Sequence, residues 1–451
     1  MNTAQQNLPT EAPQAVSFWQ ALKFWFKLGF ISFGGPAGQI AIMHEELVVR
    51  RRWLSEKRFL HALNYCMVLP GPEAQQLATY IGWLMHKTRG GIAAGALFVL
   101  PSLLILIGLS WIYIALGHVT WVAGFFYGIK PAVTAIVLQA AYRIGARALK
   151  NNLLWAIAAA SFVAIFAMNV PFPFIVLAAV VIGFVGGRMS PESFSVGGGH
   201  TAIQTAFGPA LIDDHTPTPA HALFAWKRCM QVLLAGAVLW LVPMGWLVVQ
   251  NGWDHTLTQM SWFFTKAALL TFGGAYAVLP YVNQGAVEQF GWVTATQMMD
   301  GLALGETTPG PLIMVVAFVG FVGGYAKAIL GPDSLFLAGA LAATLVTWFT
   351  FLPSFIFILA GGPFVESTHN DLKFTAPLTA ITAAVVGVIL NFALFFGYHT
   401  LWPHGFDASL DRPSAIIAVA AAIALLKFKL NVMNVIMVCG LVGICLQYGL
   451  K

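Results

Sequence analysis

The sequence has 451 residues, of which 59% are hydrophobic and only 9% are charged. About a quarter of the residues of a soluble globular protein are charged, so this composition excludes that class and indicates a polytopic membrane protein. The net charge of +6 fits loop charges that set orientation in a membrane, and nucleic-acid binding is not indicated. Continuous rather than alternating apolar runs favour helices over a membrane β-barrel.

Residues 1–17 contain no Lys or Arg and no apolar core, which predicts a disordered N-terminal tail rather than a cleaved signal peptide. An N-terminal transporter half is predicted over residues 18–188. It opens with two apolar segments, interrupted at Phe33-Gly34-Gly35-Pro36 and at Pro70-Gly71-Pro72. The basic loop from Arg50 to Arg58 between them is typical of the cytoplasmic side. Each interrupted segment is either a re-entrant hairpin or a pair of half-spanning helices.

Four full spans are predicted next, near residues 91–116, 119–142, 152–168 and 171–187. Basic residues stand at every second boundary, at Arg143, Arg147, Lys150 and Arg188. These boundaries are therefore predicted to lie on the cytoplasmic side of the membrane. Residues 189–228 are polar and rich in Gly and Pro, which predicts an exposed cytoplasmic linker.

The C-terminal transporter half is predicted over residues 229–451, beginning with a span near 229–250. Spans near 334–360, 374–397, 413–426 and 430–448 complete nine full crossings. A chain that starts in the cytoplasm and crosses nine times ends outside, so the C-terminus is predicted to be periplasmic.

The two halves carry an internal repeat. Phe272-Gly273-Gly274 stands 239 residues (272 minus 33) after the first Gly-Gly break, and Pro309-Gly310-Pro311 follows Pro70-Gly71-Pro72 at the same spacing. The basic loop is replaced in the second copy by Gln289 to Gln297, which contains no Lys or Arg. Under the positive-inside rule this predicts an all-α polytopic membrane protein with two homologous halves in inverted topology and broken or re-entrant helices.

The four breaks are the predicted substrate site. Gly and Pro free backbone polar groups that hydrocarbon cannot satisfy, and breaks at corresponding positions of two halves point to a transporter's binding site. Helix N-termini formed there would favour an anion; the alternative is that the breaks are only kinks or packing contacts. The predicted substrate-binding residues are Lys27, Gly34, Gly35, Pro70, Gly71, Pro72, Gln75, Lys130, Lys266, Gly273, Gly274, Pro309, Gly310 and Pro311.

The charged candidates each have a second interpretation. Lys27 and Lys266 precede the two Gly-Gly breaks at matched positions, and they either face a cavity or extend from a helix to the headgroups. Lys130 has no counterpart in the other half. It either contacts the anion or lies at the membrane interface. Glu73 and Glu306 border the Pro-Gly-Pro breaks, where each either carries a coupling proton or pairs with a lysine.

No catalytic motif accompanies these residues. The sequence contains no phosphate-binding loop, zinc triad or nucleophile elbow, and its four cysteines stand in or beside apolar runs without metal-ligand spacing. We therefore predict no cofactor, no metal and no enzymatic activity.

The break motifs, the Arg50-Arg51-Arg52-Trp53 loop and Glu73-Ala74-Gln75-Gln76 together resemble the chromate ion transporter family in its long, two-domain bacterial form. The resemblance covers essentially the whole chain after the tail. It implies a secondary transporter of the bacterial inner membrane that exports chromate and gives chromate resistance, with sulfate as a competing substrate. Leu312 replaces Glu73 in the second copy, so the halves differ there.

Two alternatives to chromate export stay open at this point. The first is uptake of sulfate or a related oxyanion, and the second is an intramembrane enzyme. Membrane potential or ion exchange would drive transport. The expected partners are the oxyanion and the lipid bilayer, with no nucleic acid and with a homo-oligomer as a further possibility.

Overall fold

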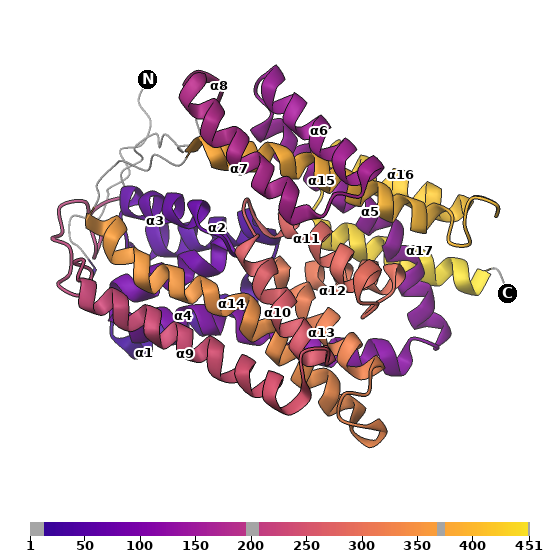
Figure 1. Ribbon diagram of the computed structural model, residues 1–451, viewed down its shortest axis with the longest axis horizontal. Helices are drawn as coiled ribbons and strands as arrows, with labels where there is room; N and C mark the ends of the chain where they lie inside the picture. Colours follow the sequence, from indigo (N-terminus) through magenta and orange to yellow (C-terminus); the bar gives the residue numbers. More distant parts are fainter. Residues whose placement is uncertain (1–12, 195–206, 368–374, 450–451) are drawn as a thin grey trace.

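The computed structural model describes residues 13–194, 207–367 and 375–449. Within these ranges the chain is helical and forms no strand beyond one isolated bridge between Leu54 and Ile212. Of the predicted disordered tail, residues 1–12 lie outside the described residues. Figure 1 shows α1, α2 and α3 gathered at one end of the molecule, with α12 and α13 further towards the other end.

The described helices follow the two predicted halves. The first half contains α1 Phe18–Ile31, α2 Gly35–His44, the π-helix η1 Glu45–Arg50, α3 Glu56–Val68, α4 Glu73–Leu116, α5 Thr120–Ala148, α6 Asn152–Met168 and α7 Phe172–Met189, and the short α8 Pro191–Phe194 lies in the predicted linker. The second half contains α9 Trp226–Asn251, α10 Thr256–Leu269, α11 Ala275–Asn283, the π-helix η2 Gln284–Gln289, α12 Ala295–Thr307, η3 Leu312–Met314, α13 Val315–Ala326, η4 Pro332–Ser334, α14 Leu335–Ser367, α15 Thr375–Leu401, α16 Arg412–Leu426 and α17 Val432–Gly449.

The interrupted segments of the first half are re-entrant hairpins. Helix α4 is two helices joined at a sharp turn, because Lys87 has φ 59° and ψ −161°. A Cβ on Gly82 would collide with the carbonyl oxygen of Gly90, so the two arms of α4 run back along each other. The α1–α2 hairpin starts at the same depth as this turn of α4, since the ring Nε2 of His86 lies 2.9 Å from the carbonyl oxygen of Val16, just before α1.

The hairpins of the second half enter from the opposite end. Arg58, at the start of α3, contacts Glu366, at the end of α14, over 2.8 Å. That end of α14 packs near Gly91, where the long arm of α4 begins. By contrast, Asp300 on α12 accepts a hydrogen bond from Tyr113, near the end of that same arm (2.9 Å). The halves are therefore inverted, as the loop charges predict.

Local geometry repeats at the spacing found in the sequence. The π-helices η1 and η2 occupy matched positions. In the loop after each one, a backbone N–H of tryptophan donates a hydrogen bond back to the π-helix: that of Trp53 to the carbonyl oxygen of Leu47 (2.7 Å) and that of Trp292 to the carbonyl oxygen of Ala286 (2.8 Å). Helices α3 and α12 both have 13 residues. The duplication thus extends from sequence to backbone hydrogen bonds.

Each predicted full crossing has a helix at its place: the long arm of α4, then α5, α6, α7, α9, α14, α15, α16 and α17. Among the described residues, seven helices are long and apolar enough to cross a membrane. The other two, α6 and α16, have 17 and 15 residues. At 1.5 Å per residue they are shorter than about 30 Å of hydrocarbon.

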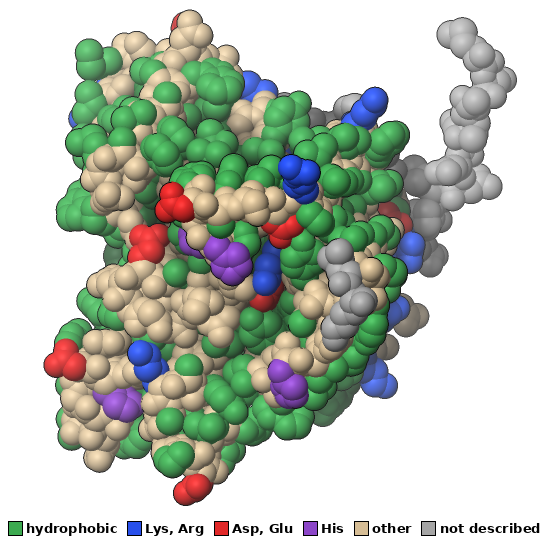
Figure 2. All heavy atoms as spheres, turned by 90° about the vertical axis from the view of Figure 1, so that its right-hand side faces the viewer, with side chains coloured by type: hydrophobic (Ala, Val, Ile, Leu, Met, Phe, Trp, Pro, Cys, Tyr) green, Lys and Arg blue, Asp and Glu red, His purple; other side chains and the backbone are tan. Residues whose placement is uncertain are grey.

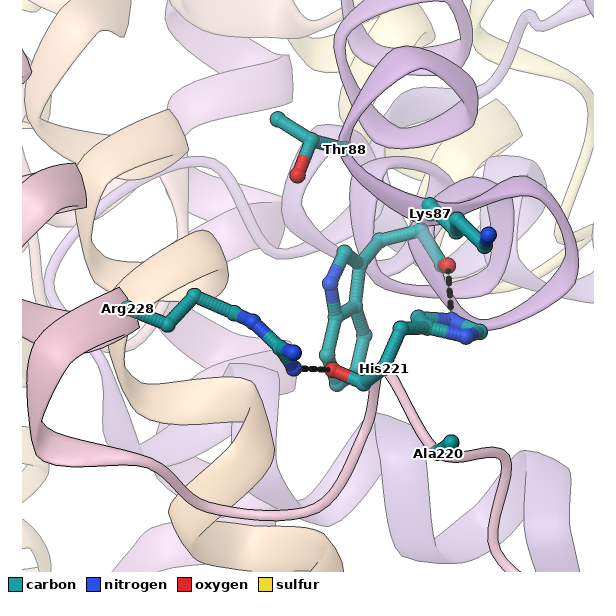
Figure 3. Close-up of a pocket in the computed structure, with 6 residues that line it drawn as sticks. Lys87, Thr88, Ala220, His221 and Arg228 are labelled. Atoms are coloured by element: carbon teal, nitrogen blue, oxygen red, sulfur yellow. Dashed lines mark hydrogen bonds between the residues drawn. The ribbon is translucent and has the colours of Figure 1, made fainter.

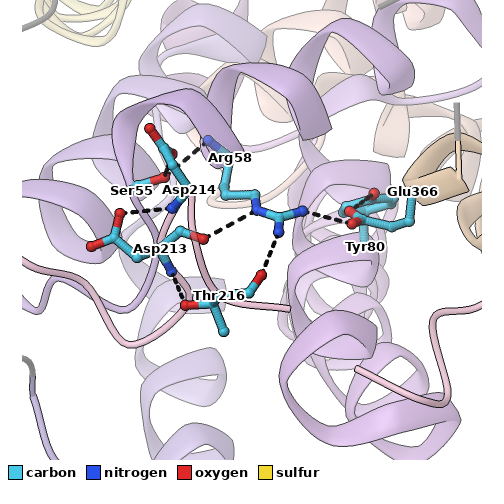
Figure 4. Close-up of polar contacts among 7 residues, drawn as sticks. All are labelled: Ser55, Arg58, Tyr80, Asp213, Asp214, Thr216 and Glu366. Atoms are coloured by element: carbon cyan, nitrogen blue, oxygen red, sulfur yellow. Dashed lines mark hydrogen bonds and ion pairs between the residues drawn. The ribbon is translucent and has the colours of Figure 1, made fainter. Parts of the chain in front are cut away.

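The linker between the halves is packed rather than free. Residues 207–225 form no helix, as their turn-forming composition indicates, but Ala210, Ile212 and Ala222 are buried. The N–H of Ile212 donates to the carbonyl oxygen of Trp53 over 3.0 Å. Figure 4 shows Arg58 between this segment and α14, donating to the carbonyl oxygen of Thr216 (2.9 Å) and to Glu366.

Candidate functional site

The two kinds of break meet across the interface between the halves. The N–H of Gly71 donates to the carbonyl oxygen of Thr271 (2.7 Å), and that of Gly310 donates to the carbonyl oxygen of Ser32 (2.8 Å). The two bonds join matched residues and are therefore related by the pseudo-twofold symmetry of the halves. Each Pro-Gly-Pro thus satisfies a carbonyl that is left free where α1 or α10 ends.

A buried glutamine strengthens one of these junctions. The side-chain amide of Gln39, on α2, donates to the carbonyl oxygen of Gly310 over 2.5 Å. Gln39 is 1% exposed, and its counterpart in the repeat is Val278. Sequence reasoning did not single it out, although a lone amide in an apolar half-helix is a weak signal.

Two helices begin at the Gly-Gly breaks. Gly34, Gly35, Gly273 and Gly274 all have positive φ, between 68° and 96°, a conformation that favours glycine. A Cβ at Gly35 or Gly274 would meet no atom within 4 Å, so backbone conformation and not close packing requires these glycines. Helices α2 and α11 begin here with unpaired amides and a partial positive charge.

A cavity of about 880 Å³ joins the two Gly-Gly breaks. It is lined by Gly34 and Gly35 on one side and by Gly273 and Gly274 on the other, and it extends along α2, α3 and α5 to His44. The cavity therefore opens at the end of the molecule that carries the basic loop, and its inner end meets helix N-termini from both halves.

Two arginines on α5 face the cavity. Arg143 and Arg147 both line it, and they stand one helical turn apart on the same face. Neither forms a hydrogen bond or an ion pair in the part of the chain that the structure describes. Two free guanidinium groups have donors that match two oxygens of a tetrahedral oxyanion. In the sequence they had marked only a cytoplasmic boundary.

Two carboxylates lie at the inner end of the same cavity. Glu73 starts α4, Glu306 ends α12, and both line the cavity. Glu306 is 7% exposed and accepts a hydrogen bond from the hydroxyl of Tyr276, on α11. Tyr276 has Ala37 as its counterpart, so this contact exists in one half only. Sequence reasoning missed Tyr276 because an asymmetric residue leaves no signal in the repeat.

The carboxylates at the mouth of the cavity already have basic partners. Glu56 lies 2.5 Å from the Nε2 of His44, and Glu45 accepts a hydrogen bond from Arg50 over 3.0 Å. These contacts leave Arg143 and Arg147 as the cations available to a ligand among the described cavity residues. Arg143 and Arg147 therefore offer an anion two guanidinium groups in a cavity that also holds Glu73 and Glu306.

Lys27 and Lys266 do not reach this cavity. Lys27 is exposed on the outer face of α1, between the exposed side chains of Phe26 and Phe30. Lys266 lies over the ring of Trp262, with its Nζ 5.7 Å from the ring centroid. This placement fits the alternative in which the lysines extend towards the headgroups.

Lys130 belongs to a different cluster. Its charge acts on Asp300, a buried residue of α12 that also accepts the hydrogen bond from Tyr113. Asp300 has His61 as its counterpart in the repeat, so no matched acid was visible in the sequence. Neither Lys130 nor Asp300 lines the cavity between the Gly-Gly breaks.

The Pro-Gly-Pro residues and Gln75 do not line the cavity. Pro70, Gly71 and Pro72, like their matched residues 309–311, hold the junction between the halves. The side-chain amide of Gln75 is fully buried and donates to the hydroxyl of Thr79 over 3.0 Å. The structure therefore brings the four glycines and both glutamates of the predicted set together at the cavity.

Gly91 and Gly320 stand where other residues approach the helix backbone closely. A Cβ on Gly91 would press on Trp83, and one on Gly320 would press on Ala343 of α14. These glycines allow close approach of helices within each half.

A smaller cavity of about 460 Å³ lies where the linker meets α4. Figure 3 shows His221 with its ring near the backbone of α4, and its Nε2 lies 3.0 Å from the carbonyl oxygen of Trp83. Arg228 donates to the carbonyl oxygen of His221. These contacts hold the linker in place, and the cavity is remote from the Gly-Gly breaks.

Comparison with known proteins gives one family. The sequence matches the family described as "Chromate transporter" over residues 19–184 and 258–444, one match in each half. It is 34% identical to the chromate transport protein of Pseudomonas aeruginosa over 96% of this chain and 94% of that protein. It is 27% identical to the chromate transport protein of Cupriavidus metallidurans, over 91% of this chain and 88% of the relative. No solved structure matches the chain.

Proposed function

We propose that this chain, which belongs to the chromate transporter family, is a secondary transporter that exports chromate from the cytoplasm and so gives chromate resistance. The observation that carries the proposal is the cavity between the Gly-Gly breaks, where two helix N-termini face two unpaired arginines. Chromate is a tetrahedral dianion, and this arrangement offers it backbone amides on one side and guanidinium groups on the other.

The side from which chromate enters follows from the distribution of charge. The cavity opens beside the basic loop that contains Arg50, Arg51 and Arg52. Under the positive-inside rule this end faces the cytoplasm of the inner membrane. Figure 2 shows the opposite end of the molecule, where Lys and Arg side chains are scattered between larger hydrophobic areas. An anion therefore reaches the site from inside the cell.

The membrane potential supplies the energy. Moving one charge across 100 mV is worth about 2.3 kcal/mol, so a dianion that leaves an inside-negative cell gains about 4.6 kcal/mol. That gain supports a concentration ratio on the order of 10³. Export is therefore favourable without an obligatory coupling ion, and Glu73 and Glu306 are the carboxylates of the cavity that can add a proton to the cycle.

Sulfate is the expected competitor because it has the same charge and tetrahedral shape. Neither the amides of the breaks nor the two arginines distinguish between these dianions by charge. Selectivity then depends on the fit of the cavity, which holds small apolar side chains such as Ala37 and Ala275 near the breaks.

Everted membrane vesicles test the proposal. Vesicles that contain the protein should accumulate radiolabelled chromate when an inside-positive potential is imposed, and excess sulfate should reduce the rate. Vesicles with Arg143→Ala are the matched control, which should show only background uptake at equal expression. Equal accumulation with and without the protein would contradict export.

A further inference from the structure

Glu306 occupies an unusual position in the cavity. Its side chain is 7% exposed, and the hydroxyl of Tyr276 donates to it from α11. Among the described residues, no Lys, Arg or His comes within 4.0 Å of its carboxylate. A buried carboxylate without a close ion pair is costly to keep ionised, so a nearby charge decides its protonation state.

Arg143 supplies that charge. Arg143 lines the same cavity as Glu306 and Tyr276, and its charge is the cationic one that acts on both. Helices α13, α15 and α17, which pack against α12, contain no Lys, Arg, Asp or Glu, and the Nδ1 of His399 on α15 lies 2.9 Å from the carbonyl oxygen of Phe395. On α12 itself, Asp300 accepts a hydrogen bond from Tyr113, and the charge of Lys130 acts on it.

The remaining charged groups of the cavity do not replace Arg143. Arg147 stands one turn further towards the mouth on α5. At the mouth, His44 is paired with Glu56, and Glu45 is paired with Arg50. Glu73, on α4, adds a negative charge. The ionised form of Glu306 therefore depends on Arg143 when the cavity is empty.

A bound dianion reverses this balance. Arg143 then turns to the oxyanion, and Glu306 is left next to two further negative charges in a site of low dielectric. Like charges disfavour the ionised carboxylate, whereas neutral Glu306 can still hydrogen-bond to Tyr276. Binding of the anion and binding of a proton therefore favour each other.

We propose that Glu306 takes up one proton from the cytoplasm when the oxyanion binds Arg143, so that the anion and the proton leave the cell together. This inference rests on the proposed function. The cycle moves one proton and one dianion outward, which is one net negative charge, and Glu306 releases its proton when the anion has left. The O–H bond of the Glu306 carboxyl is the one bond that forms and breaks in this cycle.

Proton uptake on binding tests this directly. Purified protein in weak buffer at about pH 8, with a pH-sensitive dye, receives chromate while binding is measured separately. We expect about one proton per bound chromate for the wild type and none for Glu306→Gln. A proton carried by chromate itself would be taken up by both proteins, so their difference isolates Glu306. Asp254→Asn is the matched control, because Asp254 is exposed between α9 and α10 and does not line the cavity, and its uptake should equal that of the wild type.

The outcomes separate the two proposals. Chromate binding without proton uptake, or equal uptake by the wild type and Glu306→Gln, would overturn the role of Glu306 and leave chromate transport standing. Absence of chromate binding by the wild type would overturn the proposed function, and this inference with it. Should Glu306→Gln fail to fold, Tyr276→Phe removes the hydroxyl donor and should move the proton uptake to higher pH, and an unchanged pH profile would count against the proposal.

Discussion

The backbone N–H of Gly71 in the first half donates to the carbonyl oxygen of Thr271 in the second half over 2.7 Å, and the matched pair of Gly310 and Ser32 forms the same bond over 2.8 Å. A reciprocal pair of bonds of this kind fixes the four breaks at one depth. The helix N-termini of α2 and α11 can then face a common cavity.

Replacing Gly71 by Ala should weaken this junction. Gly71 has φ 132°, and a Cβ there would press on Ser354 and Gln76. A left-handed backbone costs an L-residue about 1–2 kcal/mol. We expect a lower Tm for the purified protein. Gly108→Ala is the control, because Gly108 lies within α4 with no atom near its missing Cβ, and it should leave the Tm unchanged or raise it. Equal Tm values for the two variants would contradict a structural role for the junction.

The architecture could be predicted from the sequence because the repeat carries it. Gly-Gly and Pro-Gly-Pro recur at one spacing, and the basic loop at Arg50 loses its charge in the copy, so duplication and inversion both leave a trace. The sequence carries no signal that distinguishes re-entrant hairpins from half-spanning helices, because that choice depends on the sharp turn at Lys87.

The polar chemistry of the cavity could be predicted only in part. The four glycines are visible as breaks, but Arg143 and Arg147 look like the basic end of a span until α5 is placed beside the cavity. Tyr276 and Gln39 have apolar counterparts, so the repeat does not reveal them. Such residues become visible only in the packed structure.

Charge removal at the cavity should weaken binding far more than charge removal elsewhere. A hydrogen bond to a charged group contributes about 1.5–3 kcal/mol, so Arg143→Ala should weaken chromate binding about 10- to 100-fold. Isothermal titration would measure this. Arg188→Ala, at the end of α7 where Arg188 stacks on Phe184, is the control and should bind normally.

Lys27→Ala distinguishes the two interpretations of the matched lysines. Because Lys27 is exposed on the outer face of α1, we expect chromate binding within about twofold of the wild type. A loss as large as that of Arg143→Ala would return Lys27 to the binding site and imply a different arrangement of α1 during transport.

The buried ion pair between Arg58 and Glu366 should stabilise the fold. The two side chains are 12% and 2% exposed and lie 2.8 Å apart. Removing one partner of a buried pair typically costs about 3–5 kcal/mol. Glu366→Gln should therefore lower the Tm clearly, whereas Glu45→Gln breaks an exposed pair with Arg50 and should change the free energy of unfolding by about 0–1 kcal/mol. Similar Tm values would argue against this role.

Linker packing should depend on pH through His221. Burial, together with the charges of Lys87 and Arg228, lowers the pKa of His221 below its usual 6.5. The packed linker therefore favours neutral His221, and packing should weaken as the pH falls below about 6.5, where the free imidazole binds a proton. Hydrogen exchange of residues 207–225, corrected for intrinsic rates, should rise at low pH. The rise should be absent in His221→Gln, and a pH-independent rate in the wild type would rule out this role of His221.

The position of bound chromate tests the account most directly, because chromium scatters X-rays anomalously. Crystals grown with chromate should give an anomalous peak in the cavity between Gly35 and Gly274, within hydrogen-bond reach of the Arg143 guanidinium. A peak beside Lys130 and Asp300, or on the lipid-facing side of α1 near Lys27, would contradict the site described here.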